Sequence, residues 1–429
     1  MVLGALLLWP VATAAEARTV AVKGGKTKTI RMCGDQRRVH VLFPRQRARL
    51  TNPARRGRLI IQTCRDGRWV STQRLPRHRT TIRRPVGDFR VRNDEVHVKS
   101  AYLRYGIGEL VDAPFTMVVF NSNRSVVPCA SDDQPLAVLG HLTAPRVALE
   151  GEDRGVTLLL HGLGYGEFFW RFVAVKGYNT ARKLALAGHA VVTLDRPYYR
   201  GSKPRDDNGN ATCIGSQADM THQIVAALHD GSYNVFGTRR IAFDRVAVVG
   251  HSIGGLIAEI TAASFDGVDA LGVVSYADQA QSPLALAQVG QEIATCLLGG
   301  VKDHPGYAPF GVTQDDFRSA SLNAPTNPRV AKRVVRRRTR DPCGDVASVA
   351  SGIVVAQAAV AKITVPVLLL AGESDALFGP AAVALQRAKT PLANVTEREI
   401  PDTGHALTLG YSAPDVVKAL SDWLHDNRF

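Results

Sequence analysis

The chain has 429 residues, of which 45% are hydrophobic and 21% charged, a composition typical of a soluble globular protein with two domains or one large decorated domain. The formal net charge of +15 suggests an anionic partner, but no nucleic-acid-binding motif accompanies it, so we expect no nucleic acid among the partners. None of the cysteines forms a C-x-x-C pair, which argues against zinc and redox motifs.

Residues 1–17 are predicted to be a secretory signal peptide. The stretch from Val2 to Ala15 is almost wholly apolar, and Ala15-Glu16-Ala17 offers a small-x-small cleavage site. The run is shorter than the roughly 20 residues that span a membrane, so we expect no transmembrane segment after its removal. The sequence therefore predicts a secreted or cell-envelope protein.

Residues 18–105 are predicted to form a small basic β-rich domain, a sandwich. Short alternating stretches such as Thr19–Val22 and Arg58–Gln62 are separated by turn signals, and helical periodicity is absent. The segment carries 20 Arg and 4 Lys against 5 acidic residues, which suggests an anionic envelope polymer or lipid surface as a partner. The alternative is a solvated surface without a partner. The segment lacks the aromatic residues, interleaved with basic ones, that stack on nucleic-acid bases, and this favours the alternative.

From residue 106 to residue 429, strands alternate with helices of 10 to 15 residues. This alternation predicts an α/β fold, a mostly parallel sheet with helices on both faces. The predicted strands are Phe115–Phe120, Leu136–Leu142, Val156–Leu160, Ala190–Leu194, Ala270–Tyr276, Val365–Leu370 and Val395–Ile400, and the predicted helices are Asn179–Ala187, Ser216–His229, Pro380–Ala388 and Pro414–His425.

A candidate nucleophile lies between a strand and a helix. Residues 246–255 read VAVVGHSIGG, a valine-rich strand that runs into a G-x-S-x-G pentapeptide with Ser252 at its centre. The flanking Gly250 and Gly254 allow the sharp turn, because a Cβ at either position would clash with neighbouring backbone. The Ser252 hydroxyl is therefore predicted to project from the top of the sheet, beside the N–H groups of a helix N-terminus.

Residues 278–364 interrupt the alternation and predict a helical cap over the site. They contain helix-like runs at Leu284–Leu298 and Val346–Ala361, and a basic run from Lys332 to Arg340 that is more typical of a solvated helix face than of a binding patch. An even number of cysteines in a secreted chain favours disulfides, but sequence alone cannot choose among the pairings. Pairing near neighbours predicts Cys33 with Cys64 and Cys296 with Cys343.

A general base and an orienting acid follow the last two strands. A serine hydroxyl is a poor nucleophile at neutral pH, so it needs both groups. Asp375 follows the strand Val365–Leu370, and His405 follows the strand Val395–Ile400. Their order after Ser252 is the chain order expected for such a fold. Asp278 could serve as the acid instead, although we favour Asp375.

Two backbone N–H groups are predicted to form an oxyanion hole. One belongs to Ile253, directly after the serine, and the other to Leu163, in the His161-Gly162-Leu163-Gly164 loop that follows a predicted strand. His161 and Gly162 are expected to support this loop, His161 by hydrogen bonding and not as the base. The sequence shows no cluster of metal ligands, so we expect neither metal nor cofactor.

These residues resemble the α/β-hydrolase fold superfamily, in particular its serine esterases and lipases with a cap domain. The resemblance covers about residue 106 to the C-terminus and rests on HGLG at 161–164, DRPYYRGS at 195–202, GHSIGG at 250–255, GESD at 372–375 and GH at 404–405. It implies Ser252 as nucleophile, His405 as base, Asp375 as acid, and 278–364 as the cap. One departure, Tyr198-Tyr199-Arg200 before Gly201, bears on the shape of the pocket.

We therefore expect a secreted serine hydrolase that cleaves carboxylic esters through an acyl-enzyme intermediate. Its substrate would be a small-molecule or lipid ester. A lactone or peptide hydrolase on the same triad is an alternative. The rival from another class is a non-catalytic hydrolase-fold protein that binds its partner through the basic module at 18–105.

Overall fold

A computed structural model describes residues 110–150 and 153–429, and before them the backbone of eight strands between Arg18 and Tyr105. The larger of two compact units comprises Asp112–Thr143, Glu152–Ala185 and His189–Phe429. The predicted signal peptide at 1–17 and the predicted partner Cys33 lie outside the described residues.

The eight N-terminal strands pair into two four-stranded antiparallel sheets, with the orders β1-β8-β3-β6 and β2-β7-β4-β5. The bounds of the domain predicted at 18–105, and its anionic partner, stay predictions. The strands are β1 (Arg18–Lys23), β2 (Thr27–Ile30), β3 (Arg38–Leu42), β4 (Leu59–Arg65), β5 (Arg68–Leu75), β6 (Thr80–Arg83), β7 (Phe89–Asn93) and β8 (Ser100–Tyr105).

A nine-stranded sheet forms the centre of the larger unit, in the order β13-β9-β10-β12-β11-β14-β15-β20-β21. The strands from β12 to β21 in this order pair parallel, whereas β10 pairs antiparallel with β12. This confirms the predicted mostly parallel sheet. The strands are β9 (Leu110–Phe120), β10 (Pro135–Pro145), β11 (Gly155–Leu160), β12 (Ala190–Leu194), β13 (Asn234–Val235), β14 (Arg245–His251), β15 (Ala270–Val274), β20 (Val367–Gly372) and β21 (Val395–Ile400).

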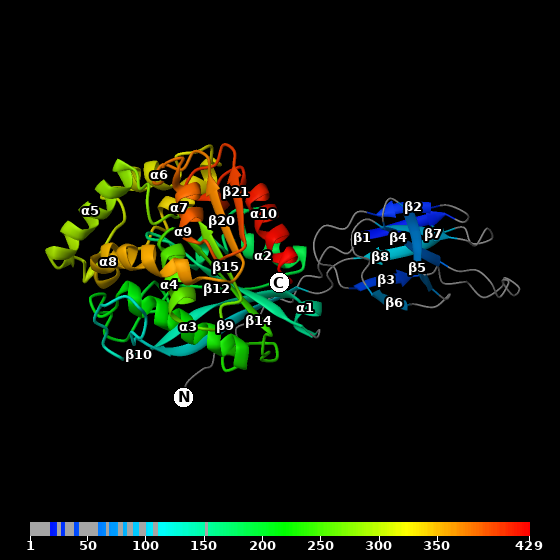
Figure 1. Ribbon diagram of the computed structural model, residues 1–429, viewed down its shortest axis with the longest axis horizontal. Helices are drawn as coiled ribbons and strands as arrows, with labels where there is room; N and C mark the ends of the chain where they lie inside the picture. The colour runs from blue at the N-terminus through cyan, green and yellow to red at the C-terminus, as the bar shows by residue number, and fades with distance from the viewer. Residues whose placement is uncertain are drawn as a thin grey trace, which may run out of the picture. The chain divides into compact units, whose positions relative to one another are not determined.

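Helices cover both faces of this sheet (Figure 1). Every residue of β11 is buried, which is why its sequence is a nearly continuous apolar run and not an alternating one. Helix α4 packs on β14 and β15, α9 packs on β20 and β21, and α10 packs on β21. Helix α1 (Arg146–Glu150) belongs to the smaller unit. The other helices are α2 (Thr180–Ala187), α3 (Ile214–Asp230), α4 (Ile253–Ser264), α9 (Ala382–Lys389) and α10 (Ala413–Asp426), with single 3-10 turns at Glu167–Phe169, Val360–Lys362 and Leu407–Leu409.

The segment between β15 and β20 is mainly helical, as the cap prediction requires. Ser282 and Asn327 cap two of its helices, and in each case a proline occupies the first helical position, whose N–H would have no partner. The helices are α5 (Pro283–Leu297), α6 (Gln314–Ser321), α7 (Pro328–Val335) and α8 (Cys343–Ala359), and the short strands are β16 (Gly300–Val301), β17 (His304–Pro305), β18 (Tyr307–Ala308) and β19 (Asp341–Pro342).

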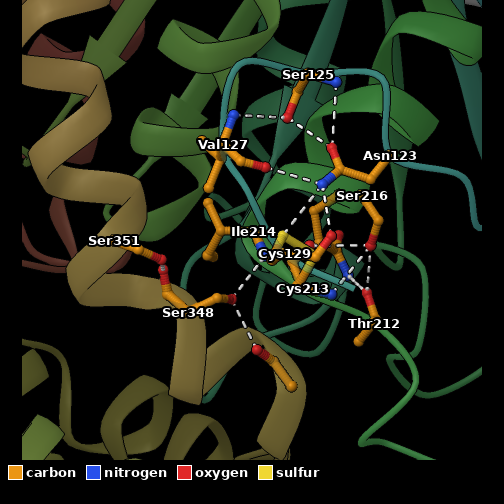
Figure 2. Close-up of a disulfide and its surroundings, with 12 residues drawn as sticks. Asn123, Ser125, Val127, Cys129, Thr212, Cys213, Ile214, Ser216, Ser348 and Ser351 are labelled. Carbon is orange, nitrogen blue, oxygen red and sulfur yellow. Dashed lines mark hydrogen bonds between the residues drawn. A yellow bond between two sulfur atoms is a disulfide. The ribbon is translucent and has the colours of Figure 1, made fainter. Parts of the chain in front are cut away.

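Two disulfides stabilise the larger unit. Cys296 pairs with Cys343, which confirms that prediction and joins the end of α5 to the start of α8. The second bridge joins Cys129 to Cys213, across 84 positions of sequence, and was not predicted. Figure 2 shows its surroundings, where the Asn123 amide donates to the carbonyl oxygens of Val127 and Cys129. The bridge fixes the β9–β10 loop to the start of α3.

Candidate active site

Ser252 lies at the sharp turn between β14 and α4. Its backbone has φ 54° and ψ −127°, a conformation that residues other than glycine seldom adopt. Its N–H donates to the carbonyl of Val274. A Cβ on Gly250 would lie 1.9 Å from the carbonyl oxygen of Gly254, and one on Gly254 would lie 2.8 Å from the carbonyl oxygen of His161. Both glycines are therefore required by the close crossing of the backbone.

His405 and Asp375 are paired at the carboxyl ends of β21 and β20. The Nδ1 atom of His405 lies 3.1 and 3.0 Å from the two carboxylate oxygens of Asp375, and both side chains are 3% exposed. Asp375 also accepts the backbone N–H of Leu377 at 2.8 Å, which fixes its orientation. Because the carboxylate accepts the Nδ1 proton, Nε2 of a neutral His405 is free to accept another.

His405 lies against the strand that carries the serine. The Nε2 of His251, the residue before Ser252, donates to the carbonyl oxygen of His405 at 2.9 Å. Phe378, which lines the same cavity as Ser252, stacks on the His405 ring. No hydrogen bond joins Ser252 Oγ to His405 within the described residues, and such bonds often tighten only when substrate binds.

Asp278 lies in a separate buried cluster. Its carboxylate accepts the Tyr276 hydroxyl at 2.8 Å and the Gln386 amide at 3.3 Å. Gln386 also binds Glu259, and burial raises the pKa of both acids above their ordinary values. Of the two candidate acids, the structure places Asp375 beside His405.

The loop at 161–164 lies directly against the nucleophile. A Cβ on Gly162 would lie 2.8 Å from the Cβ of Ser252, so this loop approaches the serine more closely than a side chain would allow. Leu163, Ser252 and Ile253 line one cavity. Ile253 begins α4, where the N–H groups have no partner within the helix. Both predicted oxyanion donors are thus on the wall that carries the serine.

His161 is a buried structural group. Its Nδ1 donates to the carbonyl of Gly162 at 2.9 Å, and its Nε2 accepts the N–H of Arg196 at 3.0 Å. Burial, together with the Arg196 guanidinium, holds the pKa of His161 well below its ordinary value. The neutral imidazole therefore has both ring nitrogens in hydrogen bonds, one of them to the carbonyl of Gly162 in the loop.

The cap supplies two residues that sequence reasoning missed. The N–H of Gly164 lies 2.8 and 3.0 Å from the carboxylate oxygens of Asp341. Thr339 donates through its N–H to Gly164 and through its hydroxyl to Tyr165, at 3.0 and 2.6 Å. About 175 positions separate these partners in sequence, so no local pattern indicates the contact.

Asp341 belongs to a buried group of charged side chains. Arg196 contacts Asp345 at 3.4 Å and donates to the Tyr199 hydroxyl at 2.8 Å. Burial raises the pKa of Asp345 to about 6, and it also raises the pKa of Asp341. The DRPYYRGS stretch thus connects the sheet to the cap.

A cavity of about 420 Å³ extends from Ser252 between the core and the cap. Its size is within the range of small-molecule sites. A few polar side chains line it, including Asp278, Gln281 and Gln357. The apolar lining residues outside the 161–164 loop and α4 are Ala285, Leu286, Val289, Ile293, Phe310, Val349, Ala350, Ile353, Leu377 and Phe378.

Comparisons with known proteins identify the family and the fold. Residues 157–420 match the family described as the alpha/beta hydrolase family. An esterase from Thermogutta terrifontis is similar in structure, with a TM-score of 0.52, 17% identity, and coverage of 73% of this chain and 100% of that one. A monoacylglycerol lipase from Paleococcus ferrophilus has a TM-score of 0.48 and 20% identity, covering 64% and 95%. No curated protein matches the chain in sequence.

Proposed function

The chain belongs to the alpha/beta hydrolase family, and from that premise we propose that it is a serine hydrolase that cleaves carboxylic esters. The observation that carries the proposal is the hydrogen-bonded pair of His405 and Asp375. It accompanies a serine with strained backbone, Ser252, which lines a cavity large enough for a substrate. Strained backbone of this kind is concentrated at functional sites.

The reaction begins at Ser252. His405 takes the proton of the Ser252 hydroxyl on Nε2 as the oxygen attacks the ester carbonyl. Asp375 accepts the Nδ1–H, keeps the ring in the required tautomer and stabilises the imidazolium that forms. The same proton then passes to the leaving alcohol, and an acyl-enzyme is left on Ser252.

Water completes the cycle by the reverse use of the same groups. His405 deprotonates a water molecule, which attacks the acyl carbonyl. The bond to Ser252 Oγ then breaks, His405 returns its proton to that oxygen, and the carboxylic acid leaves. In both halves the carbonyl oxygen becomes negative, and the N–H groups of Leu163 and Ile253 would donate to it. Such a donor contributes about 3 kcal/mol to the transition state.

The lining of the cavity favours a substrate with an apolar acyl group. Its lining beyond the serine is dominated by aliphatic and aromatic side chains, which favour groups that gain by leaving water. A lipid-like ester therefore fits the site better than a peptide does.

The two disulfides support a location outside the reducing cytoplasm, because such bridges persist in oxidising compartments. We propose on this ground that the protein acts after export. Expression of the chain in a reducing and in an oxidising compartment, followed by thiol counting, tests the idea. Recovery of fully reduced, equally active protein from both would contradict it.

A fluorophosphonate probe tests the catalytic proposal. The probe should label Ser252 covalently, and Ser252→Ala should abolish both labelling and ester hydrolysis while the fold is retained. A panel of esters, lactones and peptides then identifies the bond that is cleaved. Absence of labelling in correctly folded protein would instead support a non-catalytic role that depends on residues 18–105.

A further inference from the structure

Helix α5 of the cap buries its only charged residue and exposes mainly apolar ones, with Gln291 as an exposed polar side chain among them. Its only charged residue, Glu292, is 1% exposed, and Gln288 is also buried. Leu286 is 63% exposed and Leu297 is 83% exposed, and Leu298, directly after the helix, is 87% exposed. A surface helix ordinarily shows the opposite pattern. Something other than water is therefore expected to cover this side of α5.

Helix α8 continues the same surface. Its only charged residue, Asp345, is fully buried, while Val354 is 69% exposed. The helix packs against α5, and the Cys296–Cys343 bridge joins the two (Figure 1). Within these two described helices no exposed residue is charged. The exposed apolar residues, called here the apolar cap face, are Leu286, Ala287, Ala294, Leu297 and Leu298 with Ala347, Ala350, Val354 and Ala358.

The catalytic cavity opens on this face. Leu286 of α5 and Ala350 of α8 are exposed to solvent, and both also line the cavity that contains Ser252. Gly290, one turn after Leu286, is likewise exposed and lines the cavity. The entrance to the site is thus bordered by the two uncharged helix sides.

We propose that the apolar cap face docks on a lipid surface and draws its ester substrate directly from it. The inference rests on the proposed ester hydrolysis and adds where the substrate is taken up. A lipid surface would cover the exposed leucines and, at the same time, present the acyl chains of its lipids at the cavity entrance. A protein seated on the same face would cover the entrance and block the reaction.

The apolar cap face has no charge with which to attract charged lipid headgroups. With no exposed charge on α5 or α8, attachment depends on burying apolar side chains, so zwitterionic lipid should suffice. The stretch Cys343–Lys362 has the length and apolar composition of a membrane span, yet half of it is buried inside the protein. It therefore lies on the lipid surface and does not cross it.

Phosphatidylcholine vesicles that carry a long-chain fluorogenic ester test the proposal. The full chain should sediment with the vesicles and hydrolyse the embedded ester. Leu297→Asp/Leu298→Asp should bind at least about tenfold more weakly, since two apolar contacts are replaced by carboxylates. Neither side chain lines the cavity, so hydrolysis of a water-soluble short-chain ester should be unchanged.

Leu392→Asp is the matched control, because Leu392 is 64% exposed but lies between α9 and β21, outside the apolar cap face. Equal vesicle binding by the wild type and the double variant would overturn the proposal. So would a wild type that ignores vesicles but forms dimers which the double variant loses, since a second copy would then cover the face. Loss of hydrolysis with vesicle binding intact would contradict only the proposed function.

Discussion

Asp375 and Asp278 are both carboxylates that follow strands at one edge of the sheet, but only the first contacts an imidazole. Asp375 accepts the Nδ1 proton of His405, whereas Asp278 accepts hydroxyl and amide protons in its own cluster. An amide in place of the first carboxylate would favour the wrong tautomer of the base. Proximity to the imidazole, and not position after a strand, is therefore the ground on which we propose Asp375 as the acid.

We expect Asp375→Asn to lower kcat for ester hydrolysis by about 10⁴, as loss of the orienting acid does in comparable triads. Asp278→Asn should leave kcat close to the wild-type value, because its carboxylate does not touch His405. Steady-state kinetics on one soluble ester compares the two variants, with thermal unfolding to show that both are folded. The reverse ranking would assign the acid to Asp278.

Asp345 makes stability depend on pH. Burial raises its pKa from 3.8 to about 6 in the folded protein. Between about pH 4 and pH 6 the folded state therefore holds a proton that the unfolded chain has lost, so this residue's contribution to stability decreases as the pH rises. Asp345→Asn cannot titrate. Its stability relative to wild type should improve by up to about 3 kcal/mol between pH 4 and pH 7.

Urea unfolding of wild type and Asp345→Asn at several pH values between 4 and 7.5 measures this difference. The interaction of Asp345 with Arg196 is already contained in the folded-state pKa of Asp345, so the slope of the stability difference against pH is the informative quantity. Asp402→Asn, at an exposed turn position, serves as the control. Stability curves for wild type and Asp345→Asn that run parallel would show that the buried carboxyl does not titrate in this window.

At the scale of elements, the cap holds the loop at 161–165, which carries one of the proposed oxyanion donors, by several hydrogen bonds. Residues 339–341 bind the loop at both the N–H and the carbonyl of Gly164 and at the carbonyl of Tyr165. A misplacement of about 1 Å in an active site can cost a hundredfold in rate. We therefore expect residues 339–341 to affect the reaction through the position of this loop.

Thr339→Val removes the hydroxyl bond to Tyr165 but preserves the shape of the side chain. We expect kcat to fall about tenfold or more, through a less precisely held oxyanion donor, while KM changes little. Thr326→Val is the control, since Thr326 is a half-buried cap residue whose hydroxyl bonds only within its own turn. If both variants behaved alike, the loop would not depend on the cap.

At the scale of the whole molecule, core and cap together define the cavity, and its apolar walls predict a dependence on chain length. Each added CH₂ group on the acyl chain should raise kcat/KM about fourfold until the cavity is filled, because burial of one such group is worth about 0.8 kcal/mol. A series of soluble esters with one alcohol measures this. Ile293→Phe, which narrows the cavity, should move the optimum to shorter chains, and an unchanged optimum would place the acyl chain elsewhere.

Sequence alone predicted the features that depend on local pattern. A continuous apolar run indicates a strand buried on both faces, so β11, β12 and β14 were predictable, as was the serine turn with its two glycines. Asp375 and His405 were predictable because parallel strands end at a common edge of the sheet. Cys296–Cys343 followed from nearness in the chain.

The remaining features were decided only by tertiary structure, because they join residues that share no local pattern. The Cys129–Cys213 bridge and the contact of Asp341 with Gly164 bring together segments 84 and 177 positions apart. The exposure of apolar residues on α5 is likewise decided by tertiary structure. Its sequence predicts a helix, but the burial of Glu292 beside the acids of the cap determines which side faces out. Periodicity identifies an apolar side, and only packing decides what covers it.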